Sequence, residues 1–263
     1  MKIRRLLTIC FLAITYMATA QETNETLGPL VTDRPDQTEA STLVPVGFIQ
    51  IETGAAFETF KNGSIETEDF TINTTLIRFG LLESLELRLG WDVVDGTLKN
   101  NGNTVDVTSG FSPLLLGVKL AITEEKGALP EIGFIGHVNL PFLASSDYKP
   151  ETTGVDFRFA FTHTLSERSS LAYNIGAAWE GDNPEASYIY TIAYGYSFTD
   201  KFGAYAELYG DFPENSMANH LWDAGVTYLI SDNVQLDATV GTSITEGQDL
   251  LISGGVSFRL PTK

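Results

Sequence analysis

Charged side chains at every second position are the residues of this chain whose types and spacing could carry chemistry. In residues 85–93 (LELRLGWDV), Glu86, Arg88 and Asp92 share one parity, and leucine, tryptophan and valine occupy the other. The same pattern recurs in residues 154–165 (GVDFRFAFTHTL). Charges confined to one face of an extended segment predict a polar surface that sorts solutes by charge without covalent chemistry.

Motifs for covalent chemistry are absent from the sequence. There is no phosphate-binding glycine loop, paired-cysteine metal site or serine-centred nucleophile elbow. His137, His163 and His220 lie on separate predicted strands without metal-ligand spacing. His163 lies across a predicted turn from Ser169 and Ser170, and a Ser–His pair is what an outer-membrane phospholipase would use. Such an enzyme would also need a third orienting group, and a pair beside a turn arises easily by chance. We therefore expect no enzyme activity, metal or cofactor.

The charged positions belong to segments with a period of two residues, and no window shows a convincing helical period. Short connections (LES, SERS, TDK, SDN) alternate with longer ones, and TEEKGAL is a longer piece on the short-turn side. An even number of strands joined in this way is typical of an outer-membrane barrel. The twelve predicted strands are 47–60, 69–81, 85–95, 111–122, 130–142, 154–165, 170–180, 187–198, 202–212, 220–230, 234–244 and 249–260.

The composition of the polar parity distinguishes this barrel from a soluble β protein. A soluble sandwich would expose its polar face to bulk water, which favours Lys and Glu. Here the polar parity carries glycine, alanine, Asn, Asp and Arg, as expected for a crowded lumen. We predict an all-β, transmembrane, antiparallel up-and-down barrel of twelve strands, and a soluble exported ligand-binding β protein is a less favoured alternative.

The first residues predict export. Residues 1–20 (MKIRRLLTICFLAITYMATA) have the basic, apolar and A-x-A order of a signal peptide, so we expect the Sec route and a mature chain from Gln21. Cleavage removes the only cysteine and leaves 13 Lys and Arg against 34 Asp and Glu, a net charge of about −21. Such acidity argues against nucleic acid as a partner. The predicted organisation is 1–20 signal peptide, 21–46 polar N-terminal segment and 47–263 barrel.

Aromatic residues gather near one end of the predicted strands. If the short turns are periplasmic, Trp179 and Trp222 fall near the outer rim, and Trp91 falls slightly lower. Tryptophan favours a membrane interface because its ring is apolar and its N–H stays hydrated. These three residues are the predicted aromatic girdle.

Parity places ten acidic and five basic side chains in the lumen, which should resist anions more than cations if it conducts. Alternatively, most of these charges pair across strands and fill a narrow barrel. The main predicted charge row is Glu52, Arg78, Glu86, Arg88, Lys119, Asp156, Arg158, Asp237 and Arg259. The other inward charges are Glu58, Asp92, Glu131, Glu180, Glu207 and Asp223.

The segment LVTDRPDQTEAS (residues 30–41) precedes the first strand and offers a partner for this row. Register predicts Arg78 opposite Arg88, which is unfavourable unless carboxylates intervene. Asp33, Asp36 and Glu39 could supply them if the segment folds back into the periplasmic mouth. We therefore predict an N-terminal plug formed by Asp33, Arg34, Asp36 and Glu39, against the alternative of a solvated leader.

Several blocks in order carry a family resemblance: TDRPDQTEAS, VPVGFIQIETG, TLIRFGLLESLELRLGW, EEKGALPEIGFIGHVNLP, YGYSFTDKFGAYAELYGDF and DAGVTYLISDNVQLDATVGTS. They resemble transporter-like outer-membrane proteins of the meta-pathway of phenol degradation family, in the form common in Bacteroidetes. The resemblance spans essentially the whole mature chain. It implies a barrel that passes aromatic or other hydrophobic compounds, and it supplies no binding residues.

These observations together predict a monomeric barrel in the outer membrane of a Gram-negative bacterium that passes small molecules down a gradient. Its expected partners are outer-membrane lipids, lipopolysaccharide and the small-molecule permeant. A closed structural or surface-interaction barrel remains the alternative within the same fold.

Overall fold

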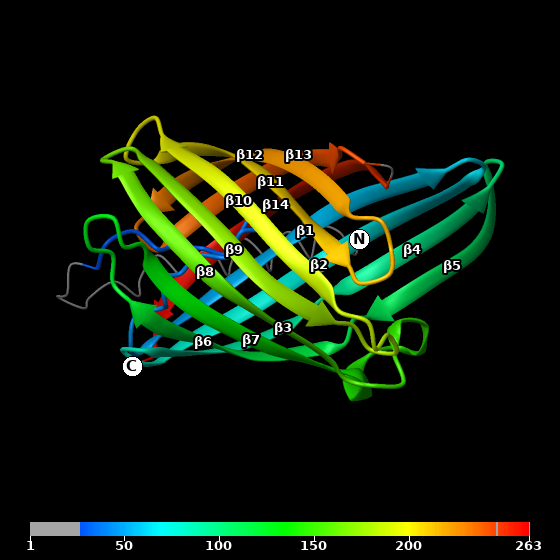
Figure 1. Cartoon of the computed structure of the whole chain (residues 1–263), viewed down its shortest axis with the longest axis horizontal. Coiled ribbons are helices and arrows are strands. Elements are labelled where there is room, and N and C mark those ends of the chain that lie inside the picture. Colours follow the sequence, from blue (N-terminus) through cyan, green and yellow to red (C-terminus); the bar gives the residue numbers. More distant parts are fainter. Residues whose placement is uncertain (1–26, 246, 263) are drawn as a thin grey trace, which may run out of the picture.

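The structure is a computed structural model that describes residues 27–245 and 247–262. Figure 1 shows an elongated barrel of strands that cross its axis obliquely. The predicted signal peptide, residues 1–20, lies outside the described residues. Within the described ranges the helices are two 3-10 turns of three residues, Pro141–Leu143 and Ser146–Tyr148, and neither could span a membrane.

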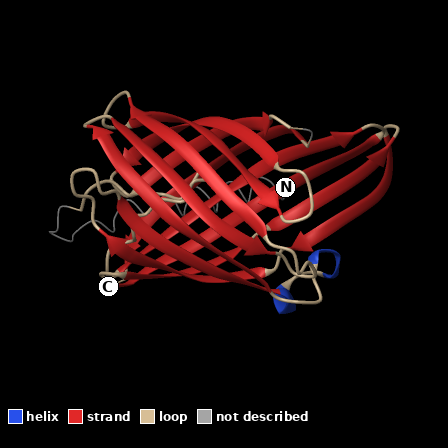
Figure 2. Ribbon diagram, viewed as in Figure 1, coloured by secondary structure: helices blue, strands red, loops and turns tan. Residues whose placement is uncertain are grey.

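Strands make up nearly all of the regular structure (Figure 2). They are β1 (Phe48–Asn62), β2 (Ile65–Leu82), β3 (Leu85–Trp91), β4 (Val93–Asn100), β5 (Asn103–Phe111), β6 (Leu114–Thr123), β7 (Glu131–Leu140), β8 (Gly154–Ser166), β9 (Ser169–Trp179), β10 (Ser187–Ser197), β11 (Phe202–Pro213), β12 (Asn219–Ser231), β13 (Val234–Ser243) and β14 (Gln248–Pro261).

The sheet closes on itself as a barrel of twelve strands. β1 pairs with both β14 and β2. β3 and β4 both pair with β2 and are separated only by Asp92, and β5 and β6 are separated only by Ser112 and Pro113. Each of these pairs is one strand with an interruption. The predicted class and count, a closed antiparallel barrel of twelve strands, are confirmed.

The two interruptions have a local cause. Pro113 lacks the N–H that a ladder requires. Next to it, the Ser112 N–H donates to the Asp92 carbonyl (3.0 Å), and the Asp92 N–H donates to Ser112 Oγ (2.8 Å). The two backbone N–H groups at the break are therefore satisfied, one by a carbonyl and one by a side-chain hydroxyl, and the wall continues past it.

One end of the barrel carries longer strands than the sequence predicted. The expected loop over residues 96–110 is wrong, because these residues extend β4 and begin β5. The strands meet at Asn101 and Gly102, whose φ values of 50° and 77° suit a two-residue hairpin turn. β1 and β2 likewise continue to a turn at Gly63 and Ser64. Both hairpins project beyond the other strands at the long-loop end (Figure 1).

Burial in this barrel is the reverse of that in a soluble protein. The largest fully buried side chains include Arg78, Lys119 and Asp223, whereas Leu87 and Leu236 are exposed on the outside. Charged side chains lie on the lumenal parity of the strands and apolar ones on the outer parity. This inversion is typical of a barrel that faces lipid.

Residues 27–46, here called the N-terminal segment, lie inside the barrel at its short-turn end, drawn in dark blue in Figure 1. Near their start, the Leu30 N–H donates to the Asp232 carbonyl in the β12–β13 turn (2.8 Å). The segment ends at Gly47, which has φ +80° and donates its N–H to the Gly80 carbonyl (3.2 Å). A glycine is suited to this left-handed turn, from which the chain enters β1.

Candidate functional site

The backbone of the N-terminal segment is bound by side chains that project from the barrel wall. Backbone polar groups inside a protein need such partners. The segment donates from Asp33 N–H to Glu52, Gln37 N–H to Glu207, Glu39 N–H to Asn174 and Val44 N–H to Glu86, at 2.8 or 2.9 Å in each case. Its carbonyls at Ala40 and Thr42 accept from Lys119 (2.8 Å) and Arg78 (3.0 Å). The path of the segment is therefore set by hydrogen bonds as well as by charge.

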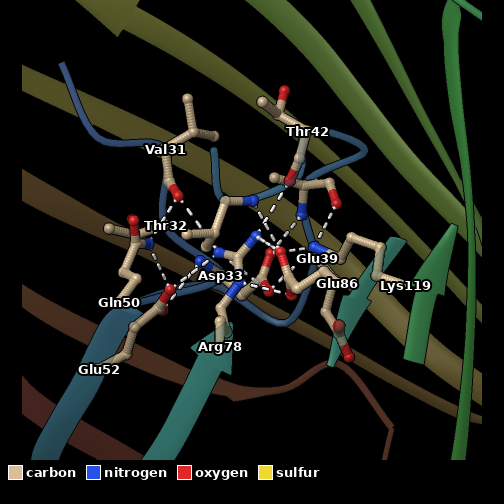
Figure 3. Close-up of polar contacts among 12 residues, drawn as sticks. Val31, Thr32, Asp33, Glu39, Thr42, Gln50, Glu52, Arg78, Glu86 and Lys119 are labelled. Carbon is tan, nitrogen blue, oxygen red and sulfur yellow. Dashed lines mark hydrogen bonds and ion pairs between the residues drawn. The ribbon is translucent and has the colours of Figure 1, made fainter. Parts of the chain in front are cut away.

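The Asp33 carboxylate is the centre of a buried ion-pair network (Figure 3). Its oxygens lie 3.2 Å from Arg78 Nη1, 2.8 Å from Arg88 Nη1 and 3.0 Å from Lys119 Nζ. All four side chains are 4% exposed or less. One carboxylate of the segment thus joins cations of β2, β3 and β6.

Two carboxylates of the wall complete this network. Glu86 lies 2.9 Å from Arg78 Nε and 3.3 Å from Arg88 Nη1, and Glu52 lies 2.9 Å from Arg78 Nη1. Arg78 and Arg88 are directly opposite in the β2–β3 register, as the sequence indicated. The repulsion between the two guanidinium groups is offset by carboxylates that lie between them.

Glu39 extends the network toward β8. Its carboxylate lies 2.6 Å from Arg88 Nη2 and 3.5 Å from Arg158 Nη1. Asp156 lies 3.0 Å from His137 Nδ1 and 3.8 Å from Arg158 Nη2. Asp156 and Arg158 are therefore joined to the segment through Glu39.

Burial and charge act in opposite directions on the two acids of the segment that meet cations. Burial by itself raises the pKa of Asp33. The combined effect of Arg78, Lys119 and Arg88 is larger and opposite, so the pKa lies well below the usual range. Burial likewise raises the pKa of Glu39, and Arg88 and Arg158 bring it below its usual value. Both carboxylates are therefore held ionised.

Arg34 turns to the opposite side of the lumen. Its Nη2 and Nε donate to the two carboxylate oxygens of Asp237 (2.9 and 3.3 Å), and its Nη1 donates to Thr74 Oγ1 (2.9 Å). The segment therefore places negative charge against one wall and positive charge against the other. Asp237, a member of the predicted charge row, therefore contacts the N-terminal segment through Arg34.

Asp36 does not lie among the arginines, contrary to the expectation from the sequence. It faces Glu207 of β11 and Asp223 of β12, which are directly paired across the two strands. Burial, and then Glu207, raise the pKa of Asp36 well above its usual range. The expectation fails because wall hydrogen bonds to Gln37 and Thr38 fix this part of the chain against β10 and β11, away from the cations.

The N-terminal segment divides the lumen into two cavities. The loop-side cavity has a volume of about 520 Å³ and is bordered by Arg88, Arg158 and Trp91, among others. The turn-side cavity has a volume of about 430 Å³ and opens among the short turns. Arg34 and Asp36 border both cavities, so this part of the segment is the partition between them.

Other predicted residues lie apart from this network. Arg259 is at the short-turn end, where it donates to the carbonyls of Gly28 (2.8 Å) and Asp232 (3.3 Å). Trp179 stacks on Phe157 on the outer face, with ring centroids 6.3 Å apart, and Trp222 is 40% exposed.

Trp91 differs from the other two tryptophans of the predicted girdle. It ends β3 at the strand interruption, in register with Thr75 in the middle of β2. It also borders the loop-side cavity.

Among the described residues, His163 and the nearby serines do not form a catalytic pair. His163 Nε2 lies 3.4 Å from the hydroxyl of Tyr173, and Ser169 Oγ lies 2.7 Å from Ser166 Oγ, so these contacts do not link a histidine to a serine. Among residues 27–245 and 247–262, no group of three or more His, Asp or Glu side chains could hold a metal ion.

Neutral polar residues of the wall also contact the N-terminal segment, and the charge pattern of the sequence did not predict them. Gln50, Asn174 and Thr191 are 4% exposed or less, and each contacts the N-terminal segment. All three occupy the inward parity of their strands. Their inward parity was the available signal, and it could have identified them together with the charged side chains.

Comparison with known proteins gives one family and one fold. Residues 32–260 match the model of the family described as "Putative MetA-pathway of phenol degradation". An outer membrane channel from Pseudomonas putida F1 superposes with a TM-score of 0.66 at 13% identity, over 82% of this chain and 97% of that chain. No match is found among curated proteins.

Two further solved structures share the barrel. The KdgM porin in complex with disordered oligogalacturonate has a TM-score of 0.52 at 11% identity, over 80% of this chain and 98% of that chain. The translocator domain of the autotransporter NalP from Neisseria meningitidis has a TM-score of 0.51 at 11% identity, over 82% of this chain and 89% of that chain. At such identities the likeness is one of fold alone.

Proposed function

The chain belongs to the MetA-pathway phenol-degradation family, and on that premise we propose that it is an outer-membrane channel for small molecules, closed by its N-terminal segment. The observation that carries this proposal is the division of one polar lumen into two cavities by a segment that is not part of the wall. Displacing the segment would join them.

The proposed location follows from the outer surface of the barrel. Apolar side chains cover the outward parity and meet lipid, and the long-loop end faces the exterior with its lipopolysaccharide. We further propose that the protein acts as a monomer, since each lumen is enclosed by one chain. The short-turn end, with the entry of the N-terminal segment, then faces the periplasm.

The proposed permeants are small compounds, hydrophobic or aromatic in part. The family description supports aromatic compounds. The loop-side cavity also supports them, because Leu76, Trp91 and Leu115 border it beside charged groups. Its volume of about 520 Å³ falls in the range of sites for small ligands. Passage would be passive, with selectivity from lumen width and charge.

A permanently closed barrel is the second candidate. The extent of pairing around Asp33 favours it, because breaking a buried ion pair without replacement is costly. In this alternative the segment fills the lumen and the barrel interacts only through its surface. The two candidates differ in whether the segment ever leaves.

Conductance in a planar bilayer tests the proposal. Wild type is compared with a variant lacking residues 21–42, and both are first located by membrane fractionation. We expect small or intermittent currents from wild type and larger, steady currents from the variant. Silence from both proteins would reject the channel, and equal currents from both would reject closure by the segment.

Liposome swelling tests the permeant class. Neutral aromatic solutes are compared with sugars of similar size, in liposomes that contain the wild-type protein. We expect faster swelling with the aromatic solutes. Entry of neither would favour the closed barrel, and equal entry would overturn the preference for aromatic compounds.

A further inference from the structure

The residues that contact the Arg34 guanidinium, namely Asp237, Thr74, Gly54 and Gly255, are here called the seat of Arg34. They have the form of a binding site for a planar cation. All three guanidinium nitrogens have partners: two reach the carboxylate of Asp237, and the third reaches Thr74. The Asp237 side chain is fully buried, and that of Arg34 is 15% exposed. Bidentate pairing of this kind recognises a guanidinium by its planar fork as well as by its charge.

Two glycines let the Arg34 guanidinium lie flat against the backbone of the wall. Gly54 of β1 and Gly255 of β14 are directly paired across the strands. A Cβ on Gly54 would lie 2.6 Å from Arg34 Nη2, and one on Gly255 would lie 2.5 Å from Arg34 Nε. The guanidinium plane thus lies against bare backbone of both strands. Any side chain at either position would fill the space that the planar group occupies.

The wall around the seat carries three acidic side chains and few basic partners for them. Glu207, Asp223 and Asp237 lie on the adjacent strands β11, β12 and β13. Among the described residues, these three carboxylates make one ion pair, which joins Asp237 to Arg34. Both carboxylate oxygens of Asp223 are buried and lack a hydrogen-bond partner within the described chain. Low-dielectric walls strengthen the attraction of such carboxylates for a cation.

Four basic side chains of the lumen are paired with carboxylates, and Arg259 of β14 donates to the carbonyls of Gly28 and Asp232 at the short-turn end. Arg78, Arg88, Lys119 and Arg158 belong to β2, β3, β6 and β8, where they meet carboxylates of the segment and the wall. Because the four cations are paired, they repel a positively charged solute near Asp237 less than free cations would. Because Arg34 borders both cavities, a solute can reach the edge of the seat from either one.

We propose that Asp237, Thr74 and the backbone at Gly54 and Gly255 form a binding site for guanidinium-type organic cations, which Arg34 occupies when the segment is docked. A free planar cation competes with Arg34 for this site. Its binding loosens the segment between the two cavities. The binding itself does not depend on the proposed channel, whereas any effect on opening does.

Chemical rescue tests the site in the detergent-purified full chain. Arg34→Ala empties the seat, and thermal unfolding is followed with methylguanidinium chloride at constant ionic strength. We expect the midpoint temperature of Arg34→Ala to rise with methylguanidinium, and Arg34→Ala/Asp237→Asn to show no rise. Tetramethylammonium, which is not planar, and urea, which is neutral, should bind at least about tenfold more weakly.

Matched controls decide whether the effect is specific. Arg168→Ala removes an arginine of the β8–β9 turn that donates to the Phe198 carbonyl, so methylguanidinium should not stabilise it. Equal stabilisation of Arg34→Ala and Arg168→Ala, or of Arg34→Ala with and without Asp237→Asn, would overturn the proposal. So would the absence of any rise in Arg34→Ala.

A second variant covers the case in which Arg34→Ala does not fold. Arg34→Lys keeps the charge but loses the planar fork, so methylguanidinium should displace it at a concentration about tenfold lower than in wild type. Hydrogen exchange of residues 30–41 reports the displacement. Equal midpoints in the two proteins would reject the site. These readouts need no membrane, so loss of conductance alone would count against the channel and not against the site.

Discussion

Asp33 shows how one carboxylate can hold three strands of the wall. It meets Arg78, Arg88 and Lys119 within 3.2 Å, in a region closed to solvent. Two cations of this group lie directly opposite each other, so the network is stable only while negative charge stays between them. Removing Asp33 should therefore weaken both the docking of the segment and the packing of the lumen.

The substitution Asp33→Asn tests this role. We expect the free energy of unfolding to fall by about 3–5 kcal/mol, because buried cations lose their partner. Denaturant titration of the purified protein checks the stability, and bilayer recordings should show more frequent opening. Lys201→Ala, at an exposed turn, is the control and should change neither quantity. An Asp33→Asn protein with wild-type stability and current would contradict the role.

Asp36 should make docking of the segment depend on pH. Burial and Glu207 raise the pKa of Asp36 in the docked segment. In the released segment Asp36 has an ordinary pKa of about 4, so above this pH it loses a proton that the docked segment retains. Docking is then tightest at low pH and weakens as pH rises through the raised pKa. Asp33 and Glu39 do not offset this change, because their pKa values are lowered and both stay ionised.

The measurement is channel opening as a function of pH. Open probability should rise between pH 5 and pH 8, by up to about tenfold for each unit of pKa shift within that window. Asp36→Asn should show a smaller rise, because only the neighbouring acids then titrate. A wild-type response that matches the Asp36→Asn response, or that runs in the opposite direction, would reject the assignment. Groups facing Asp36 that could also contribute are Glu207, Asp223, Asp33 and Tyr205.

The positions of these acids show what charge alone could predict. The strands around Arg78, Arg88 and Lys119 carry too few acids to balance these cations. This shortage predicted that Asp33 lies among them, and Asp33 pairs with all three. The same reasoning placed Asp36 there as well, and the structure places it elsewhere. Neutral hydrogen bonds from the wall decide the course of the backbone, and their pairing cannot be deduced from a charge count.

At the scale of elements, the segment and β2 are in direct backbone contact. A Cβ on Gly80 would overlap the carbonyl groups of Val44 and Pro45. Val46 also forms a parallel bridge with Gly80. The close approach leaves no room for a side chain at this position of β2.

Gly80→Ala should therefore displace the C-terminal part of the segment while the barrel stays folded. We expect faster hydrogen exchange of residues 43–47 and little change in the strands. Gly136→Ala is a matched control, because its Cβ would lie at an ordinary 3.5 Å from Phe134. Exchange that is unchanged in Gly80→Ala, or equally fast in both variants, would contradict the contact.

Sequence patterning was sufficient for the strands but not for their ends. Alternation of apolar and polar residues predicted the class and count because the inside and outside of a barrel wall are different solvents. It failed over residues 96–110, where Leu98, Val105 and Val107 are the only large apolar side chains among glycines and polar residues. The Asn101–Gly102 dipeptide, a strong hairpin signal, was the feature that could have corrected the loop.

At the scale of the whole molecule, the lumen should prefer cations. The inward parity was predicted to carry ten acids and five bases, and the N-terminal segment adds Asp33, Asp36, Glu39 and Arg34. Removing the segment subtracts two net negative charges and leaves an excess of acids. The preference should therefore persist in the open lumen, and it should fall with salt as charges are screened.

Reversal potentials in a KCl gradient measure this preference. We expect potassium to permeate more readily than chloride in the variant lacking residues 21–42, and less so when Asp223 and Asp237 are both changed to Asn. Lys201→Ala again serves as the control. A preference for chloride would show that the basic side of the lumen dominates the field.

The N-terminal segment is continuous with β1 through Gly47, so its release never separates it from the lumen. Reclosure is an intramolecular reaction, and for a short tether the effective local concentration is on the order of millimolar. A solute that keeps the lumen open must outcompete Arg34 and Asp33 at that concentration. The open fraction should thus respond to the abundance of the solute and remain independent of the amount of protein in the membrane.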